Sequence, residues 1–374
     1  MGEVLAMDEL DLSRYAVQTD LALEARQLAL DKHPVLEGVE IEEEKEQGVT
    51  ITRIHVLNQK GARQIGKQPG RYVTLEAPGL RSKDTILQHR LTSLLARELK
   101  RFLRQIGVGD EDRVLVIGLG NWNVTPDALG PIVAGKVLVT RHLFELMPDQ
   151  VEPGYRPVSA LSPGVLGMTG IETSEIIYGV VEKTRPDLIV AVDALASRSL
   201  ERVNTTIQIA DTGIHPGSGV GNKRKPVTRE TLGVPVIAIG VPTVVDAVSI
   251  VSDTIDYLLA HLGRQWKEQQ SPPKPASVLT PQGFQLPGPS PQYTAADLPD
   301  PTVREVLMGL LGGLSAQEKR QLIHEVLTPI GHNLVVTPKE VDTFIEDIGH
   351  LIAGGLNAAL HEAVNLDNLS SFTH

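Results

Sequence analysis

Three short, uninterrupted apolar runs constrain the fold of this chain more than any other feature. They are V-L-V-I-G-L at 114–119, L-I-V-A-V at 188–192 and P-V-I-A-I-G-V at 235–241. None of them alternates apolar with polar residues, so each is typical of a strand that is covered on both faces, as in a parallel sheet. A weaker run, T-I-Q-I-A at 206–210, indicates a further strand.

Stretches with helical spacing separate these runs. They lie near 132–146, 171–184 and 243–262. Alternating strands and helices are the pattern of an α/β fold, in which helices cover both faces of the sheet. We therefore predict an α/β protein whose mostly parallel sheet is sandwiched by helices.

The flanking sequence predicts additional elements. Before the core, β-branched residues indicate strands at 49–56 and 71–75, and a stripe of leucines indicates a helix over 84–106. A segment with nine prolines, 271–301, cannot continue a helix or a central strand and is predicted to be a surface segment. Beyond it, helical patterns cover three stretches, the last opening with Thr337 as its expected N-cap: 302–311, 315–328 and 338–364.

Composition excludes several classes of function. Asp and Glu number 46 against 35 Lys and Arg, a formal charge of −11, which argues against a protein that binds nucleic-acid backbones over a wide surface. With no cysteine, the chain has no disulfide, thiol nucleophile, iron–sulfur cluster or Cys-ligated zinc, and suits a reducing cytoplasm. No run is apolar for the length of a membrane helix, and we expect no signal peptide.

Two aspartates follow predicted strands at the edge where α/β proteins bind their ligands. Asp193 comes directly after the run at 188–192, and Asp127 lies in the segment that follows 114–119. Two carboxylates brought together there can share one proton, so that one acts as a general base on water and the other as a general acid. An aspartate after a buried strand is equally typical of the N-cap of a following helix.

Other interpretations of the same edge remain open. The glycine-rich segment 213–225, G-I-H-P-G-S-G-V-G-N-K-R-K, resembles a phosphate-binding nest, although a structural loop with a solvated basic patch explains it as well. His215 in this segment would complete a metal site with Asp127 and Asp193, but the three residues have no metal-ligand spacing.

Several longer motifs resemble the germination protease family of endospore-forming bacteria, and the resemblance covers nearly the whole chain. These motifs include D-L-S-R-Y-A-V-Q-T-D-L-A-L-E, G-L-G-N-W-N-V-T-P-D-A-L-G-P, M-T-G-I-E-T-S-E-I, A-V-D-A-L-A-S-R-S, V-P-T-V-V-D-A-V-S and G-G-L-N-A-A-L-H. The resemblance implies a fold similar to that of hydrogenase-maturation peptidases, with extra N-terminal strands and C-terminal helices.

The resemblance also implies an activity. Such an enzyme is an endopeptidase, a hydrolase that degrades small acid-soluble spore proteins during germination, works as a homotetramer in the cytoplasm of the developing spore and in the spore core, and needs no cofactor. The family is regarded as an atypical aspartic type, and its two catalytic carboxylates fall here on Asp127 and Asp193. A metal-dependent peptidase of the hydrogenase-maturation type, and a phosphate- or nucleotide-binding module using 213–225, remain alternatives.

Family members are made as zymogens that process themselves, and their substrates are cut after an acidic residue in Thr-Glu-(large apolar)-Ala. Thr19-Asp20-Leu21-Ala22 resembles that pattern with Asp in place of Glu. We therefore predict a propeptide over 1–20, cut between Asp20 and Leu21, and a single peptidase domain over 21–374.

Overall fold

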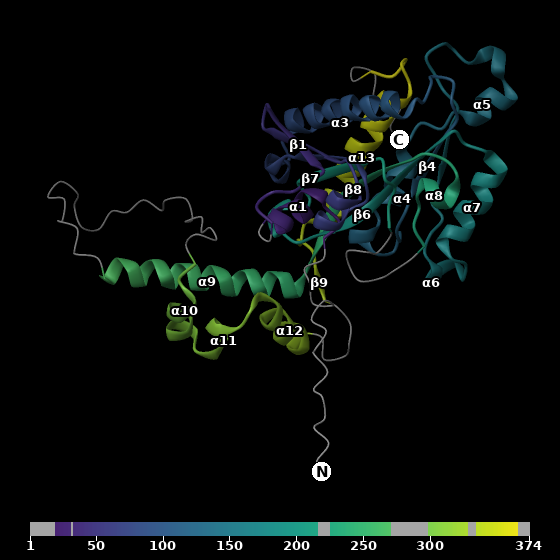
Figure 1. Cartoon of the computed structure of the whole chain (residues 1–374). Helices are drawn as coiled ribbons and strands as arrows, with labels where there is room; N and C mark the ends of the chain where they lie inside the picture. The colour runs from purple at the N-terminus through teal and green to yellow at the C-terminus, as the bar shows by residue number, and fades with distance from the viewer. Residues whose placement is uncertain (1–18, 31–32, 216–224, 271–297, 328–333, 366–374) are drawn as a thin grey trace. The chain divides into compact units, whose positions relative to one another are not determined.

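The computed structural model describes residues 19–30, 33–215, 225–270, 298–327 and 334–365 (Figure 1). The chain forms two compact units, one made of 18–246 and 335–374 and the other of 1–17 and 247–334. The propeptide at 1–20 and the single domain over 21–374 stay predictions, and most of the proline-rich segment lies outside the described residues.

The larger unit is built on one mixed sheet, and the predicted α/β class is confirmed. Among the described residues the sheet has nine strands in the order β1-β2-β3-β7-β8-β6-β4-β5, with β9 paired to β8. The strands are β1 (Val39–Glu46), β2 (Val49–Val56), β3 (Gly70–Glu76), β4 (Val114–Gly118), β5 (Val158–Leu161), β6 (Leu188–Ser197), β7 (Thr206–Ala210), β8 (Val236–Asp246) and β9 (Val335–Val336).

Parallel pairing joins β5, β4, β6 and β8, while β1, β2, β3 and β7 form an antiparallel half that joins β8. The three apolar runs are the parallel strands β4, β6 and β8, as predicted, and the weaker run is β7. The connection 198–205 from β6 to β7 is too short for the helical crossover that a parallel neighbour needs, so β7 turns back antiparallel to β8.

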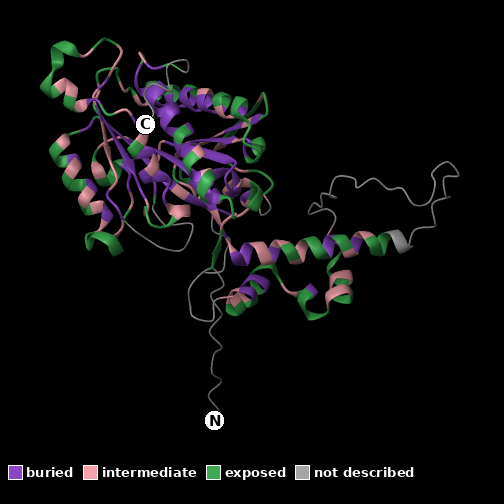
Figure 2. Cartoon of the chain, turned by 180° about the vertical axis from the view of Figure 1, so that it is seen from behind, coloured by how far each residue is buried: buried purple, intermediate pink, exposed green. Residues whose placement is uncertain are grey.

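Helices cover both faces of this sheet. On one face α3 (Thr85–Ile106), α4 (Leu129–Lys136) and α13 (Val341–Leu360) share the largest apolar cluster with the strands. The other face carries α7 (Thr173–Thr184), whose Ile177 and Val181 pack on β4 and β6, and α1 (Ala22–Leu30) with α2 (Gln59–Ile65) over β2 and β3. In Figure 2 the centre of the sheet is almost continuously buried, whereas β1 at its edge is exposed.

Shorter helices complete this unit. They are the 3₁₀ turns η2 (Pro78–Ser82), η3 (Thr125–Asp127), η4 (Pro148–Gln150) and η5 (Leu200–Arg202), with α5 (Arg141–Leu146), α6 (Leu166–Thr169) and α8 (Arg229–Leu232).

The smaller unit is helical in its described part. It contains α9 (Ala247–Gln270), α10 (Pro301–Met308), α11 (Leu310–Gly313) and α12 (Ala316–Leu327). Helices α10 and α12 both contact α9, and an ion pair between Lys319 and Asp256 joins α12 to α9.

Three local predictions are wrong in instructive ways. The helix expected near 243–262 begins only at Ala247, because β8 continues through the β-branched residues that precede it. The helix expected near 132–146 is two helices, α4 and α5. The last helix begins at Val341, and the Thr337 hydroxyl donates to the carbonyl of Thr243 instead of capping it.

Candidate active site

Asp193 lies at the point where β6 loses one of its two neighbours. Strand β4 pairs with β6 only as far as Gly118 opposite Val192, and the Leu119 N–H still donates to the Val192 carbonyl at 2.8 Å. On its other side β6 remains paired with β8 through Ser197. The segment from Asp193 onward therefore has an edge that β4 has vacated, beside the carboxyl end of a parallel strand.

The structure removes the N-cap interpretation of Asp193. No helix follows it, because β6 continues to Ser197. Its side chain is 6% exposed, and its Oδ1 accepts a hydrogen bond from the Ala194 N–H at 2.9 Å. A buried carboxylate inside a strand, at the level where the neighbouring strand ends, is a placement expected of a functional group rather than of a helix cap.

Asp127 reaches the same edge through the short turn that follows β4. It ends η3, and its carbonyl accepts from the Asn121 N–H at 3.0 Å, which closes the loop on itself. From β8, on the far side of β6, the Thr243 hydroxyl donates to the Pro126 carbonyl at 2.7 Å. The loop is thus fixed at both of its ends.

Two glycines allow this close approach. A Cβ on Gly130, at the start of α4, would lie 2.2 Å from the Leu119 carbonyl oxygen and 2.5 Å from that of Val192. A Cβ on Gly118 would lie 2.1 Å from the Gly130 carbonyl oxygen. Only residues without a Cβ let the helix start against the ends of β4 and β6, and this contact carries Asp127 to the strand that bears Asp193.

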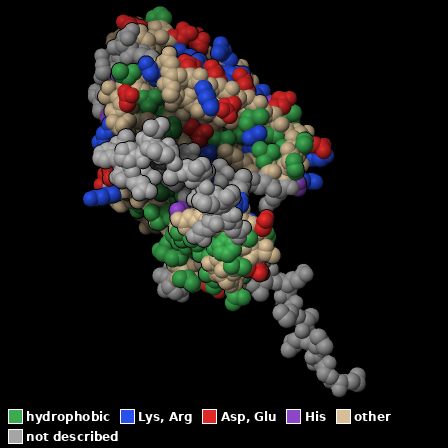
Figure 3. Space-filling model, turned by 90° about the vertical axis from the view of Figure 1, so that its left-hand side faces the viewer, with side chains coloured by type: hydrophobic (Ala, Val, Ile, Leu, Met, Phe, Trp, Pro, Cys, Tyr) green, Lys and Arg blue, Asp and Glu red, His purple; other side chains and the backbone are tan. Residues whose placement is uncertain are grey.

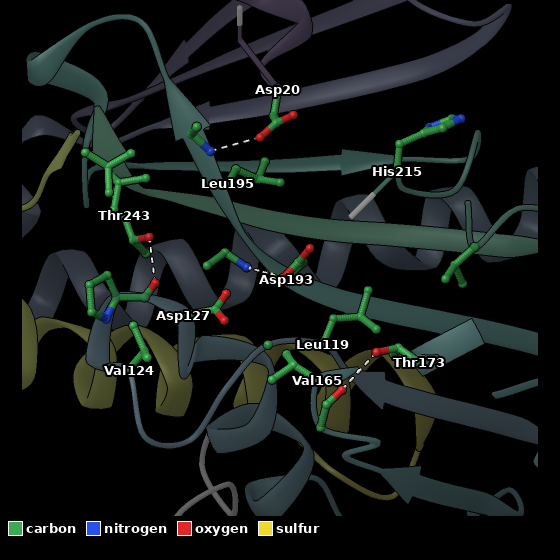
Figure 4. A pocket seen from close by; sticks show the side chains of 18 of the residues that line it. Asp20, Leu119, Val124, Asp127, Val165, Thr173, Asp193, Leu195, His215 and Thr243 are labelled. Atoms are coloured by element: carbon green, nitrogen blue, oxygen red, sulfur yellow. Dashed lines mark hydrogen bonds between the residues drawn. The ribbon is translucent and has the colours of Figure 1, made fainter. Parts of the chain in front are cut away.

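The two aspartates line one cavity of about 280 Å³, although Asp193 lies inside β6 and not directly after it as expected (Figure 4). Asp20, Gly120, Thr173 and His215 line it as well. In Figure 4 the side chain of Asp127 lies below that of Asp193, and Asp20 lies above both. The cavity therefore brings the predicted catalytic residues and the predicted cleavage position together.

The segment around Asp20 and Leu21 is docked on the edge that β4 vacates. The Asp20 N–H donates to the Ala196 carbonyl at 3.1 Å, and the Ala196 N–H donates to Oδ2 of Asp20 at 2.9 Å. Leu21 and Ala22 are fully buried, Leu21 within the apolar cluster of β4, β6 and α7. Asp20 thus pairs with β6 as a residue of an additional edge strand would.

Sequence reasoning missed the polar residues that fix this segment. Glu24, 2% exposed, accepts the backbone N–H groups of Arg198 and Ser199 at 2.7 and 3.0 Å and pairs with Arg202. Lys67 and Gln208 also contact the segment. A glutamine inside the apolar run 206–210 was a usable signal for the last of these, whereas nothing local marks Lys67.

His215 lines the cavity, but in Figure 4 its ring points away from the two aspartates. In the part of the chain that the structure describes, no group of three or more His, Asp or Glu side chains is arranged to hold a metal ion.

Of the predicted phosphate nest, 216–224 lies outside the described residues, and Lys225 lines the cavity. Among the described helices none is both long and apolar enough to cross a bilayer.

Comparison with known proteins identifies the family. The family model described as germination protease matches residues 17–373. Curated relatives named germination protease come from Bacillus mycoides and Bacillus anthracis. They are 56% identical over 370 and 371 residues, respectively, covering 98% of this chain and 100% of each relative. Relatives of this length and identity share both fold and activity class, so this peptidase chain belongs to the germination protease family.

Proposed function

We propose that this chain is an aspartic-type endopeptidase zymogen that cuts itself between Asp20 and Leu21 and then degrades small acid-soluble spore proteins. One observation carries the proposal: Asp20 lines the same cavity as Asp127 and Asp193 and is hydrogen-bonded to β6 three residues beyond Asp193. A cleavage position and a carboxylate pair in one cavity are what self-processing requires.

The chemistry follows from two carboxylates that share one proton. The ionised carboxylate takes a proton from a water molecule as the water oxygen attacks the carbonyl carbon of Asp20. The protonated partner then donates its proton to the leaving nitrogen of Leu21 as the C–N bond breaks. One water is consumed, and the pair ends with one proton, as it began.

The finer assignments come from the family resemblance. They are the spore-protein substrates, a homotetrameric assembly, and action in the developing spore and the spore core. Lys225 at the cavity is a candidate cation for an acidic residue before the cut, together with Lys223 and Arg224, which lie outside the described residues. Membership of a peptidase family favours this proposal over a phosphate-binding module.

Mass spectrometry of the full chain before and after mild acidification tests the proposal. Wild type is expected to lose residues 1–20, and Asp193→Asn is expected to stay intact. Asp187→Asn is the matched control, because Asp187 precedes the opposite end of the same strand and pairs with Arg113 at the surface. A wild-type chain cut elsewhere would refute the cleavage position. Equal cutting of Asp193→Asn would refute the catalytic assignment, and chelator assays would then address the metal-dependent alternative.

A further inference from the structure

The carbonyl group of Asp20 is held by two side chains that no motif singles out. Lys67 Nζ donates to the Asp20 carbonyl oxygen at 2.8 Å, and Gln208 Nε2 donates to the same oxygen at 3.1 Å. Lys67 follows α2, and Gln208 lies in the middle of β7, so both come from the antiparallel half of the sheet. This oxygen belongs to the peptide bond that the proposed cleavage breaks.

Gln208 fixes the bond from both sides. Its Oε1 accepts the Ala22 N–H at 2.6 Å while its Nε2 donates to the Asp20 carbonyl. A single primary amide thus bridges the residue before the bond and the second residue after it, and this pairing determines which way the amide is oriented. Gln208 is 8% exposed, so its position is set by packing as well as by these bonds.

Lys67 donates to the Asp20 carbonyl oxygen from a charged ammonium group. A neutral N–H or O–H donor would satisfy an ordinary carbonyl oxygen. The Lys67 ammonium also donates to the Thr19 carbonyl at 3.1 Å, and its removal from solvent lowers the pKa of Lys67, an effect that the carboxylates of Asp20 and Glu24 oppose. Desolvating an ammonium group is costly. A desolvated ammonium group at this position would strongly stabilise negative charge that develops on the oxygen it contacts.

We infer that Lys67 and Gln208 form the oxyanion hole for self-processing at the Asp20–Leu21 bond. The inference rests on the proposed function and adds residues to it. When water attacks the Asp20 carbonyl carbon, a C–O bond forms and the carbonyl π electrons move to the oxygen, where both donors stabilise the charge. As the carbonyl re-forms, the C–N bond to Leu21 breaks, and the proton held by the aspartate pair goes to the leaving nitrogen.

The first test measures the rate at which the full chain acquires Leu21 as its N-terminus. Lys67→Met is expected to slow this rate about 100-fold, as for removal of one oxyanion donor. Lys67→Arg keeps a cation and is expected to regain part of the rate. Lys60→Met, a substitution in the preceding helix at an exposed lysine paired with Glu37, is the matched control and is expected to cut at the wild-type rate.

A second measurement separates charge from packing. The chain has no cysteine, so Lys67→Cys introduces the only thiol. The unfolded variant is alkylated with 2-bromoethylamine, which restores an ammonium group at nearly the native length, or with iodoacetamide, which adds a neutral amide of similar size. After refolding, the inference expects the ammonium adduct to cut at least 10-fold faster than the neutral one.

The outcomes distinguish this inference from the proposed function. If wild type is not cut at Asp20–Leu21, both the proposed function and the inference are overturned. If wild type is cut there while Lys67→Met is cut within threefold of its rate, the inference alone is overturned. If Lys67→Met does not fold, the two Lys67→Cys adducts decide, and equal rates for the two adducts overturn the inference.

Discussion

The two halves of the sheet divide the proposed reaction between them. The parallel half presents Asp127 after the end of β4 and Asp193 within β6, and both line one cavity. The antiparallel half supplies Lys67 and Gln208, which hold the segment to be cut. The parallel half can be inferred to carry out the chemistry, and the antiparallel half to position the bond.

The halves also differ in how they are stabilised. Strand β4 is buried throughout, and β6 is buried except at Ala194 and apolar except at Asp193 and Ser197, whereas β1 is exposed and carries five glutamates. Arg53 of β2 crosses from Glu42 and Glu44 on β1 to the buried Glu98 on α3. Figure 3, which views the molecule from the side where β1 lies in Figure 1, shows acidic and basic side chains intermixed. Charge pairing therefore stabilises the exposed β1 edge, whereas β2, β3 and β7 are held, like the parallel strands, by apolar packing.

The largest effect is expected from a substitution that removes a catalytic carboxylate without loosening the segment around Asp20 and Leu21. Asp127→Asn keeps the size of the side chain but removes the shared proton, so self-processing is expected to fall at least about 10³-fold while the melting temperature stays close to wild type. Asp149→Asn is the matched control, since Asp149 also lies in a proline-containing 3₁₀ turn but at an exposed position. Timed mass spectrometry measures both. Retained cutting in Asp127→Asn would place the chemistry elsewhere.

The second prediction concerns the antiparallel half. Arg53→Met leaves the carboxylate of Glu98, whose side chain is 2% exposed, without its main partner, and is expected to cost about 3 kcal/mol of unfolding free energy. Arg97→Met is the matched control, because Arg97 also contacts Glu98 at 3.6 Å but is 44% exposed, and it is expected to cost less than about 1 kcal/mol. Urea unfolding measures both variants. The folded Arg53→Met protein is expected to cut itself normally, and a parallel loss of cutting would break the division between the halves.

How much of this could be predicted from sequence follows the division only in part, because β2, β3 and β7 of the antiparallel half were predicted as well. The parallel strands and the two aspartates were recognisable, because uninterrupted apolar runs and the residues after them are local features. Strand β1 was missed, since V-E-I-E-E-E-K-E is too charged to indicate a strand until its partner Arg53 is known. Lys67 lies far in sequence from Asp20, and only the tertiary fold shows that its ammonium reaches that carbonyl.

The third prediction tests the close approach that positions Asp127. Gly130→Ala would place a Cβ within 2.5 Å of backbone oxygens of Leu119 and Val192. These oxygens belong to the backbone at β4 and β6, so the clash can be relieved only if α4 or the strands shift. We expect a loss of about 2 kcal/mol in stability together with slower cutting, because η3 must shift. Gly135→Ala, on the same helix, meets only a Trp122 ring atom at 3.9 Å and is expected to be neutral or slightly stabilising. Thermal melts and cutting rates of both variants decide, and equal behaviour would show that the approach is not limiting.

The smallest expected effect is a dependence of folding stability on pH, which arises from a buried histidine directly after α13. His361, directly after α13, is fully buried, and its ring nitrogens contact the Arg156 N–H and the Leu138 carbonyl. Burial, with a smaller contribution from the charge of Arg156, lowers the pKa of His361 from 6.5 to about 4.

Between these two values the unfolded chain binds a proton that the folded chain does not, so stability falls as the pH is lowered from 6.5 towards 4. At pH 5 this amounts to about 1–2 kcal/mol relative to pH 7. His361→Gln keeps a polar side chain without the titration, and its urea midpoint is expected to change less between pH 7 and pH 5 than that of wild type. His350 is exposed on the same helix, so His350→Gln is expected to keep the wild-type slope. Because the processing experiment also uses mild acidification, processing of His361→Gln separates two effects of acid. If this variant still processes at pH 5, acid acts on the catalytic site rather than by loosening the helix end that supports it.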